Sequence, residues 1–230
     1  MLTNAQEKLI RSLDSKKGRR EAGRCLVEGA KNILECGGYL DFRFTPEETT
    51  DFASLVDTVT PQPGAAVARI PSHSPDEIMK NDVIVVLDGV QDPGNVGTIL
   101  RLCLGFDASL ILIESADPAS PKVVRSSAGA FFKTPWLEVP RPGAEEALAS
   151  YKGYAVYRLE KEGKGEALSF TSQAAAALPK KMMIIAGSEG QGIKLDIAGT
   201  SLSIPHNPAL ESLNVAIAIG LILSNIYQKD

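Results

Sequence analysis

The chain has 230 residues, of which 44% are apolar, and a formal net charge of −4. This composition excludes an intrinsically disordered chain and leaves room for one large domain or two smaller ones with a substantial core. The slightly acidic balance excludes a general nucleic-acid coat protein, although a local basic face remains compatible with it.

Residues 1–75 are predicted to form a small α/β domain, because short helical and strand-like runs alternate there. Helices are expected at 5–13 and 28–35, a charged turn or helix start at 15–23, and strands at 25–27, 42–44 and 65–70. Pro46 is expected to begin a further helix with Thr45 as its N-cap. The turn-rich Pro71–Pro75 segment marks the predicted boundary, so residues 76–230 form the second domain.

From Asp82 onward, strands and helices alternate, which predicts a mostly parallel sheet covered by helices on both faces. The expected strands cover 83–87, 109–113, 136–139, 154–159, 182–186 and 201–204. The expected helices cover 95–104, 123–132, 145–151 and 212–227, and the alanines at 174–177 are also expected to be helical. The last helix is apolar nearly all round, which indicates burial in the core or against a second subunit.

The cysteines and the start of the chain predict a cytoplasmic protein without a metal site. Cys25, Cys36 and Cys103 share no metal-ligand spacing, and we interpret them as reduced thiols, with a Cys25–Cys36 disulfide as the open alternative. Met1–Lys8 lacks the apolar core of a signal peptide. The longest apolar stretch, Val215–Leu223, is shorter than the roughly 20 residues that span a bilayer.

A basic cluster near the N-terminus is a candidate phosphate-binding surface. Its members are Lys16, Lys17, Arg19, Arg20 and Arg24. Their clustering matters because attraction to phosphate is screened beyond roughly 8–10 Å. A solvated charged turn is an equal alternative for so short a run.

Three segments of the second domain share one pattern, in which an apolar strand ends abruptly in small and polar residues. They are Asp88–Arg101, Ile184–Ile193 and Leu202–Ala216. Ligands of open α/β sheets bind at the carboxyl ends of parallel strands. The pattern therefore predicts one composite site. Ser212 is expected as the N-cap of the last helix, whose free N–H groups then point toward that site.

The glycines of the second segment do not form a nucleotide-binding fingerprint. Gly187, Gly190 and Gly192 surround Glu189 in the order G-x-E-G-x-G, and neither a dinucleotide motif nor a Walker loop has that order. A carboxylate at Glu189 would repel a pyrophosphate but would tolerate a cationic or sugar-bearing ligand. His206 has no partners at metal-ligand spacing, so zinc is not expected and we interpret this residue as a loop histidine.

The three segments, in this order and with this spacing, resemble the three motifs of the SpoU (TrmH-type) branch of the SPOUT RNA methyltransferases. The similarity covers residues from about 82 to 228 and includes Asp117, Pro121–Ser126 and Gly129. The N-terminal part resembles the small RNA substrate-binding domain that many members carry, through Lys16–Arg20 and Leu26–Gly29.

The resemblance implies an enzyme that transfers a methyl group from S-adenosylmethionine to a ribose 2′-hydroxyl of RNA. It also implies a C-terminal deep trefoil knot and a homodimer with the last helix in the interface. The implied cofactor-binding residues are Gly187, Ser188, Glu189, Gly192, Ile204, Pro205, Leu213 and Asn214. The implied catalytic residues are Asn95, Arg101, Glu189, Ser212 and Asn214. The expected RNA-binding residues are Lys16, Lys17, Arg19, Arg20, Arg24, Lys122 and Arg125.

Arg101 would manage the hydroxyl proton by analogy with the family. A guanidinium keeps its proton, with a pKa above about 12, so we favour phosphate anchoring and orientation of the hydroxyl. Asn95 would hydrogen-bond near the reacting centre, and Glu189 would orient Arg101 or the ribose.

The chain departs from the family pattern at Leu102–Cys103, where Thr-Ala is frequent, and at His206 and Pro208, where Met and Gly are frequent. These departures affect the shape of the cofactor loop and the RNA target. The N-terminal domain favours ribosomal RNA of the 23S type. A transfer RNA target and a non-catalytic RNA-binding module of the same fold are the alternatives, and an unrelated small-molecule α/β enzyme is a third hypothesis.

Overall fold

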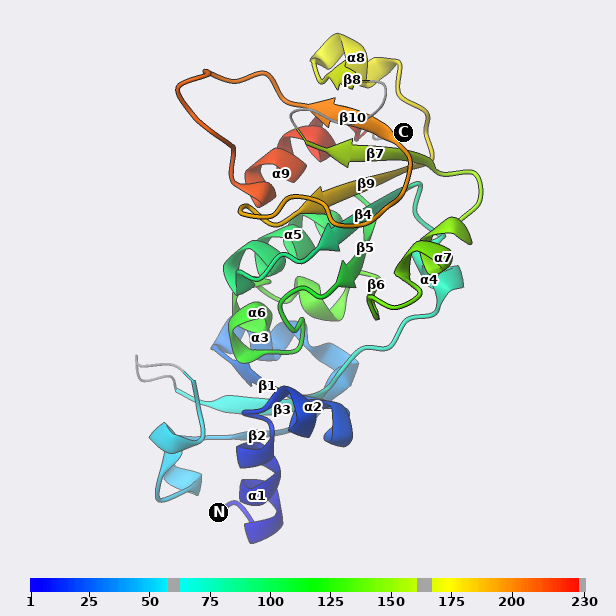
Figure 1. Cartoon of the computed structure of the whole chain (residues 1–230). Helices are drawn as coiled ribbons and strands as arrows, with labels where there is room; N and C mark the ends of the chain where they lie inside the picture. The colour runs from blue at the N-terminus through cyan, green and yellow to red at the C-terminus, as the bar shows by residue number, and fades with distance from the viewer. Residues whose placement is uncertain (58–62, 161–166, 228–230) are drawn as a thin grey trace.

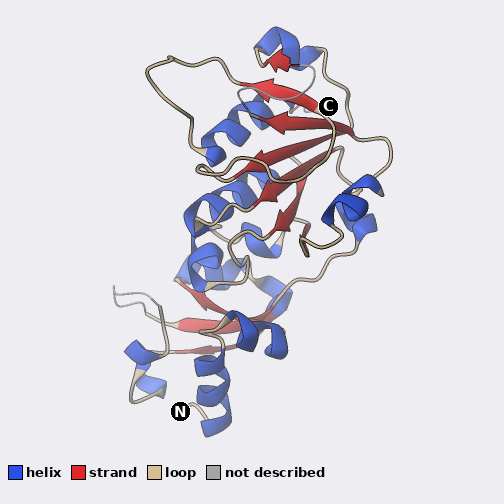
Figure 2. Cartoon of the chain, viewed as in Figure 1, coloured by secondary structure: helices blue, strands red, loops and turns tan. Residues whose placement is uncertain are grey.

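The computed structural model of the protein describes residues 1–57, 63–160 and 167–227 and contains two β-sheets. A three-stranded sheet lies at the N-terminal end of the molecule, and a seven-stranded sheet forms the larger part (Figure 1). Helices lie on both faces of the larger sheet, as Figure 2 shows. None of the helices in the described ranges is long and apolar enough to cross a membrane.

The N-terminal sheet is antiparallel, with the strand order β1-β3-β2. Its strands are β1 (Arg24–Glu28), β2 (Leu40–Phe44) and β3 (Ala65–Arg69). The helices around it are α1 (Asn4–Ser12), α2 (Lys16–Ala22) and α3 (Ala30–Glu35), with 3₁₀ turns η1 (Gly37–Tyr39), η2 (Pro46–Glu48) and η3 (Phe52–Ser54). The elements expected from the sequence are present within a few residues, and the helix expected at Pro46 is a single 3₁₀ turn capped by Thr45.

Local caps fix the turn between α1 and α2. The Ser15 side chain accepts a hydrogen bond from the Gly18 N–H at 3.0 Å and so begins α2. Gly23 ends α2 at a φ of 61°, in the left-handed region that favours glycine. Leu13 and Asp14 therefore lie in a short turn between two capped helices.

The larger sheet is parallel at all its described pairings, with the strand order β6-β5-β4-β9-β7-β10-β8. Its strands are β4 (Val83–Asp88), β5 (Ala108–Ile113), β6 (Trp136–Val139), β7 (Ala155–Leu159), β8 (Ala167–Ser169), β9 (Met182–Gly187) and β10 (Thr200–Ser203). Its helices are α4 (Pro75–Ile78), α5 (Pro93–Gly105), α6 (Pro121–Ser126), η4 (Ala130–Phe132), α7 (Ala144–Ala149), α8 (Ser172–Ala176) and α9 (Val215–Ile226). The predicted α/β class, a parallel sheet covered on both faces, is confirmed.

Alternation of side chains along β4 separates two hydrophobic cores. Val85 and Leu87 belong to the core on the α5, α6 and α9 face. Ile84 and Val86 belong to the core on the α4 and α7 face. All four are fully buried, which explains why this strand is a continuous apolar run. By the same alternation, the Asp88 side chain lies on the α4 and α7 face, at the end of β4.

The first of these cores continues into the N-terminal sheet. Cys25 and Val27 of β1 are buried in the same cluster as Val123 and Val124 of α6. The three cysteines are free and buried, as the sequence interpretation expected. Burial raises the pKa of the Cys25 and Cys103 thiols, so they have little thiolate character.

The helix expected over 123–132 is interrupted. Ala128 and Gly129 take φ angles of 50° and 92°, which end α6 and start the separate turn η4. A Cβ atom on Gly129 would lie 2.4 Å from the Cβ of Glu35, so the break lets this loop approach α3 of the N-terminal region. Sequence periodicity could not indicate that approach.

The last helix begins later than expected. Its N-cap is Asn214, whose Oδ1 accepts hydrogen bonds from the N–H groups of Ala216 and Ile217, and Ser212 lies outside the helix. Two short elements, α4 and β8, were not expected from the sequence. Both are shorter than the windows over which periodicity is informative.

Candidate active site

A pocket opens at the carboxyl end of the larger sheet, between the ends of β7, β9 and β10 and the start of α9. It encloses about 700 Å³, which includes space open to solvent. Apolar side chains and backbone form most of its wall, with two carboxylates at the rim. The lining residues are Leu159, Glu160, Ala186, Gly187, Ser188, Glu189, Gly192, Leu202, Ser203, Ile204, His206, Ser212, Leu213, Val215 and Ala218.

Two glycines shape the wall that follows β9. A Cβ atom on Gly187 would lie 2.1 Å from the carbonyl carbon of Gly192, so the two backbones touch with no space for a side chain. Gly192 has a φ of 64°, and its N–H donates to the Ser188 carbonyl at 2.9 Å. The resulting turn is closed, and its two glycines present backbone to the pocket.

A chain of hydrogen bonds joins three of the predicted site residues beside this pocket. Asn214 donates from Nδ2 to Oδ1 of Asn95 at 2.9 Å, and Asn95 donates from Nδ2 to Oε1 of Glu189 at 2.8 Å. Asn214 also caps α9, so its amide is held at both ends. The chain thus links α5, the turn after β9 and the start of α9.

The start of α5 holds Asn95 in this position. The Asp92 side chain accepts a hydrogen bond from the Asn95 N–H at 2.7 Å and caps the helix. Gly97 lies directly against α6, since a Cβ atom there would be 1.9 Å from Oγ of Ser126. The Ser126 hydroxyl donates to the Pro93 carbonyl at 3.1 Å. The close packing of α5 on α6 therefore fixes the end of α5 that carries Asn95.

The other predicted site residues lie outside this hydrogen-bonded chain. Arg101 is on the exposed side of α5, and no hydrogen bond or ion pair joins it to another of the described residues. Ser212 lines the pocket and is exposed. Pro205 is exposed and, like Asn214, is not among the lining residues.

Sequence reasoning missed several lining residues. Glu160 follows β7, where no motif marks it, and its carboxylate accepts a hydrogen bond from the Ser201 hydroxyl at 2.9 Å. His206, expected to be a plain loop residue, lines the pocket, with Nδ1 2.7 Å from the Ile204 carbonyl oxygen. The strand that ends before Glu160 was predicted, so its carboxyl end could have been included in the composite site.

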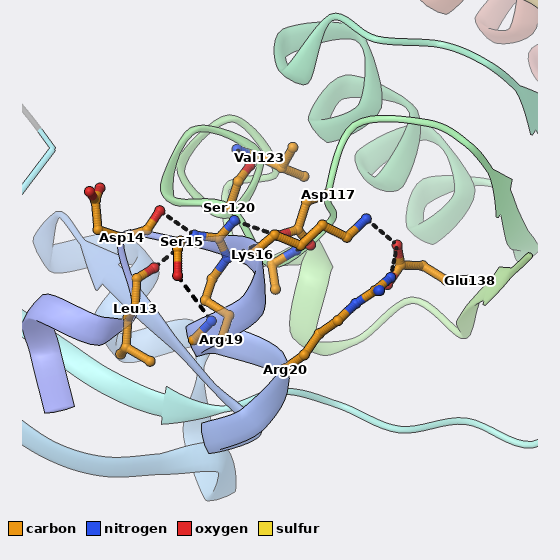
Figure 3. Close-up of polar contacts among 12 residues, drawn as sticks. Leu13, Asp14, Ser15, Lys16, Arg19, Arg20, Asp117, Ser120, Val123 and Glu138 are labelled. Carbon is orange, nitrogen blue, oxygen red and sulfur yellow. Dashed lines mark hydrogen bonds and ion pairs between the residues drawn. The ribbon is translucent and has the colours of Figure 1, made fainter.

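The basic cluster of the N-terminal region is largely turned toward the protein itself (Figure 3). Arg19 is 5% exposed, and its Nε and Nη2 donate to Oδ2 of Asp117 at 2.9 and 2.5 Å. Its Nη1 donates to the carbonyls of Leu13 and Asp14 at 2.7 and 2.8 Å. Because these groups occupy the guanidinium, Arg19 is not available to RNA in this conformation, contrary to its predicted role.

Most other members of the expected RNA-binding set also have acidic partners. Lys16 and Arg20 both pair with Glu138 of β6, at 2.9 and 3.2 Å, and Figure 3 shows these pairs beside the Arg19 contact. Arg24 pairs with Asp41 at 2.5 Å. Arg125 pairs with the buried Glu28 at 2.6 Å and with Asp57 at 3.3 Å. Lys17 and Lys122 are the exposed members of the set that lie free of such inter-element pairs in the described part of the chain.

Comparison with known proteins identifies relatives over nearly the whole chain. The 23S rRNA (guanosine(2553)-2′-O)-methyltransferase RlmP of Bacillus subtilis is 27% identical over 248 residues, covering 97% of this chain and 96% of that protein. A TrmH-family structure from Porphyromonas gingivalis superposes with a TM-score of 0.80 at 31% identity, covering 98% of both chains. An AdoMet-bound rRNA methyltransferase from Sinorhizobium meliloti superposes with a TM-score of 0.77 at 25% identity, covering 98% of this chain and 95% of that one.

The parallel sheet, its strand-end pocket and the C-terminal helix beside that pocket belong to a fold shared with the TrmH-family structure. The sequence model of the SpoU rRNA Methylase family matches residues 82–224, and the chain belongs to this family. It is an S-adenosylmethionine-dependent RNA 2′-O-ribose methyltransferase. The family fold implies a trefoil knot, an exception to the rule that chains do not thread loops.

The residues of the pocket fit this cofactor. S-adenosylmethionine has an apolar adenine face, two ribose hydroxyls, a positively charged sulfonium and ammonium, and one carboxylate, and it carries no phosphate. Apolar walls from Leu159 and Leu202, and backbone exposed around Gly187, suit the first two features. The carboxylates of Glu160 and Glu189 suit the positive charge and would repel a nucleotide phosphate.

Proposed function

We propose that this methyltransferase modifies a ribose in ribosomal RNA of the 23S type. The observation that carries the proposal is the end-to-end similarity to the Bacillus subtilis enzyme, whose name specifies a guanosine of 23S rRNA. The similarity extends through the N-terminal sheet, which lies outside the matched family region of residues 82–224. An accessory N-terminal region that both proteins carry supports a shared class of RNA.

The methyl donor is proposed to bind in the strand-end pocket. Gly187, Gly192, Ile204 and Leu213 line it with backbone and small or apolar groups, and Ser188 contributes a hydroxyl. When bound, S-adenosylmethionine supplies a methyl group activated by a positively charged sulfur. Much of the remaining catalytic work is then positioning and exclusion of water.

The hydrogen-bonded chain beside the pocket is proposed to hold the target ribose. Asn95 and Asn214 orient Glu189 through its Oε1, while Oε2 has no hydrogen-bond partner among the described residues. That oxygen is free to accept a hydrogen bond from a ribose hydroxyl. Arg101, charged and exposed on the same helix as Asn95, is proposed to anchor the neighbouring phosphate. Ser212, at the pocket rim, is a further hydroxyl within this set.

The RNA is proposed to cross from this site toward the N-terminal domain, residues 1–75, with residues 76–230 as the catalytic domain. Lys17 and Lys122 are the best candidates for phosphate contacts, because both are exposed. Phosphate contacts position an RNA without identifying the nucleotide.

A homodimer through α9 is proposed as the working assembly. Ile217 and Leu221 on this helix are 59% and 42% exposed, and Leu104 on the neighbouring α5 is 39% exposed. Such a patch of large apolar side chains favours a protein contact. We expect Ile217→Asp to shift the protein from dimer to monomer in sedimentation velocity, with Leu34→Asp, at an exposed leucine on α3, as the matched control. A wild-type protein that sediments as a monomer would contradict the assembly.

The test of the target compares two RNA substrates. Purified protein, radiolabelled S-adenosylmethionine, and either a 23S rRNA transcript or a mixture of unmodified transfer RNA transcripts are combined, and ribose methylation is read from its resistance to alkaline cleavage. We expect methylation of the 23S transcript at one position. Methylation of transfer RNA alone would overturn the ribosomal target and leave the enzyme class intact.

The proposed role of Asn95 is tested in the same assay. Asn95→Ala removes the link between α5 and Glu189 and should lower the rate by about 100-fold, because small displacements of reacting groups cost that much. Asn207→Ala, at an exposed amide in the loop before α9 but outside the pocket lining, is the matched control. Equal rates for both variants would exclude Asn95 from the reaction.

A further inference from the structure

Residues 193–197, which follow the glycine turn after β9, are held to the sheet by charged side chains from both neighbouring strands. In the sheet, β9 lies between β4 and β7. Asp88 at the end of β4 and Arg158 in β7 both point to the α7 face, where Leu195 is buried. The segment therefore lies over the end of its own strand with one charged side chain on each flank.

Asp88 holds the N–H groups of this segment. Its Oδ2 accepts hydrogen bonds from the N–H of Lys194 at 2.6 Å and of Leu195 at 2.8 Å. Its side chain is fully buried. A buried carboxylate needs a counter-charge, and Arg141 supplies it, with Nη2 2.6 Å from Oδ1 in an ion pair not aligned as a hydrogen bond.

Arg141 is held beside Asp88 by a second carboxylate, that of Glu114. Burial opposes its charge, but the negative charges of Asp88 and Glu114 outweigh that effect and raise the pKa of its guanidinium. Its Nε donates to Glu114 at 2.9 Å. Arg141 therefore stays charged beside Asp88.

Arg158 holds the carbonyl groups of the same segment. Its Nη1 donates to the carbonyls of Leu195 and Ile197 at 3.0 and 2.9 Å. Its Nε donates to Glu160 at 3.0 Å, and Glu160 lines the pocket. Arg158 thus joins the carbonyls of Leu195 and Ile197 to Glu160 of the pocket wall.

We propose that Asp88, Arg141 and Arg158 are positioning residues for the methyl donor: they clamp residues 194–197 and so fix the glycine turn that forms one wall of the pocket. Gly192 is only two residues before Lys194, and its backbone is in contact with Gly187 of the lining. Release of the clamp lets this wall move while the strands stay paired. The inference rests on the proposed location of the methyl-donor site.

The first test measures S-adenosylmethionine affinity by isothermal titration. Asp88→Asn removes the buried charge that pairs with Arg141, and we expect the Kd to rise by at least about tenfold, equal to about 1.4 kcal/mol. Arg141→Met should weaken binding, whereas Arg141→Lys, which keeps the positive charge, should retain most of the wild-type affinity. Asp117→Asn is the matched control, because it breaks a buried acid–arginine pair that makes no contact with this segment among the hydrogen bonds of the described residues. Its Kd should stay within about twofold of wild type.

The second test is hydrogen exchange of peptides that cover residues 188–198. Asp88→Asn should speed exchange there and leave β10 unchanged, whereas Asp117→Asn should leave these peptides unchanged. A wild-type Kd for Asp88→Asn, or equal weakening by Asp117→Asn, would overturn the clamp and leave the methyl-donor site standing. If the wild-type protein does not bind S-adenosylmethionine, the proposed methyl-donor site is wrong. The exchange rates then test only whether Asp88 holds residues 194–197 in place.

Discussion

Two of the buried acid–arginine pairs in this protein, Asp88–Arg141 and Arg19–Asp117, fasten backbone segments and distribute their charge in opposite ways. In the Asp88–Arg141 pair, the acid is the fully buried partner and collects two backbone N–H groups. In the Arg19–Asp117 pair, the arginine is the more buried partner and collects two backbone carbonyls. The buried carboxylate of Asp88 thus accepts hydrogen bonds from N–H groups, and the buried guanidinium of Arg19 donates hydrogen bonds to carbonyls.

The two pairs hold different parts of the molecule. Asp88 fixes the segment after the pocket-lining turn, whereas Arg19 fixes the turn between α1 and α2 against the loop after β5 (Figure 3). The first pair should therefore govern cofactor affinity, and the second should govern the attachment of the N-terminal region. The following substitutions can separate these two roles.

The largest effect on stability is expected from Arg19→Ala. Removing one partner of a buried pair leaves Asp117 and the carbonyls of Leu13 and Asp14 without their donors, and should cost about 3–5 kcal/mol of unfolding free energy. Urea denaturation measures the loss. Arg20→Ala, whose side chain is 61% exposed, is the control and should cost no more than about 1 kcal/mol. Similar losses for both variants would show that Arg19 is not a fastening residue.

A smaller effect is expected in α5, which packs closely on α6. Gly97→Ala places a Cβ atom 1.9 Å from Oγ of Ser126 and 2.9 Å from the Ser127 nitrogen, so the helices must separate. We expect a loss of about 1–3 kcal/mol. Gly105→Ala, in the same helix with open space around it, should instead be neutral or slightly stabilising. Thermal unfolding of both variants decides whether the α5–α6 contact is as close as described.

The smallest effects concern RNA affinity. Lys17→Ala and Lys122→Ala should each reduce the slope of log affinity against log salt by about 0.7–0.9, as expected for one lost phosphate contact. Arg24→Ala should leave the slope unchanged, because this arginine is paired with Asp41. Filter binding of a 23S rRNA transcript over a range of salt concentrations measures all three. A slope that falls for Arg24→Ala alone would reverse the assignment.

The larger sheet could be predicted well from the sequence because its strands are buried on both faces. Val83 to Leu87 needs no partner information to be recognised as such a strand. The end of α6 could not be predicted in the same way, because Ala128 adopts a positive φ that its residue type does not favour. Ser212 and Asn214 are both good N-caps, and only the path of the preceding loop decides between them.

Site residues that lie in sequence motifs could be predicted, whereas a residue outside any motif could not. Asn95, Glu189 and Asn214 lie in three separate motifs and come together in one hydrogen-bonded chain. Glu160 has no motif and was missed. The basic cluster was expected to face RNA because the sequence displays its charges, but the partner of Arg19 is 98 residues away along the chain.

Isothermal titration of two glycine variants tests whether the pocket at the end of β9 binds S-adenosylmethionine. Gly187→Ala brings a Cβ atom within 2.1 Å of the Gly192 backbone, whereas Gly190→Ala, in the same turn, meets no atom within 4 Å. We expect Gly187→Ala to weaken binding by at least about 100-fold, equal to about 2.8 kcal/mol, with Gly190→Ala within about threefold of wild type. Wild-type affinity for a folded Gly187→Ala protein would show that S-adenosylmethionine does not bind in this pocket.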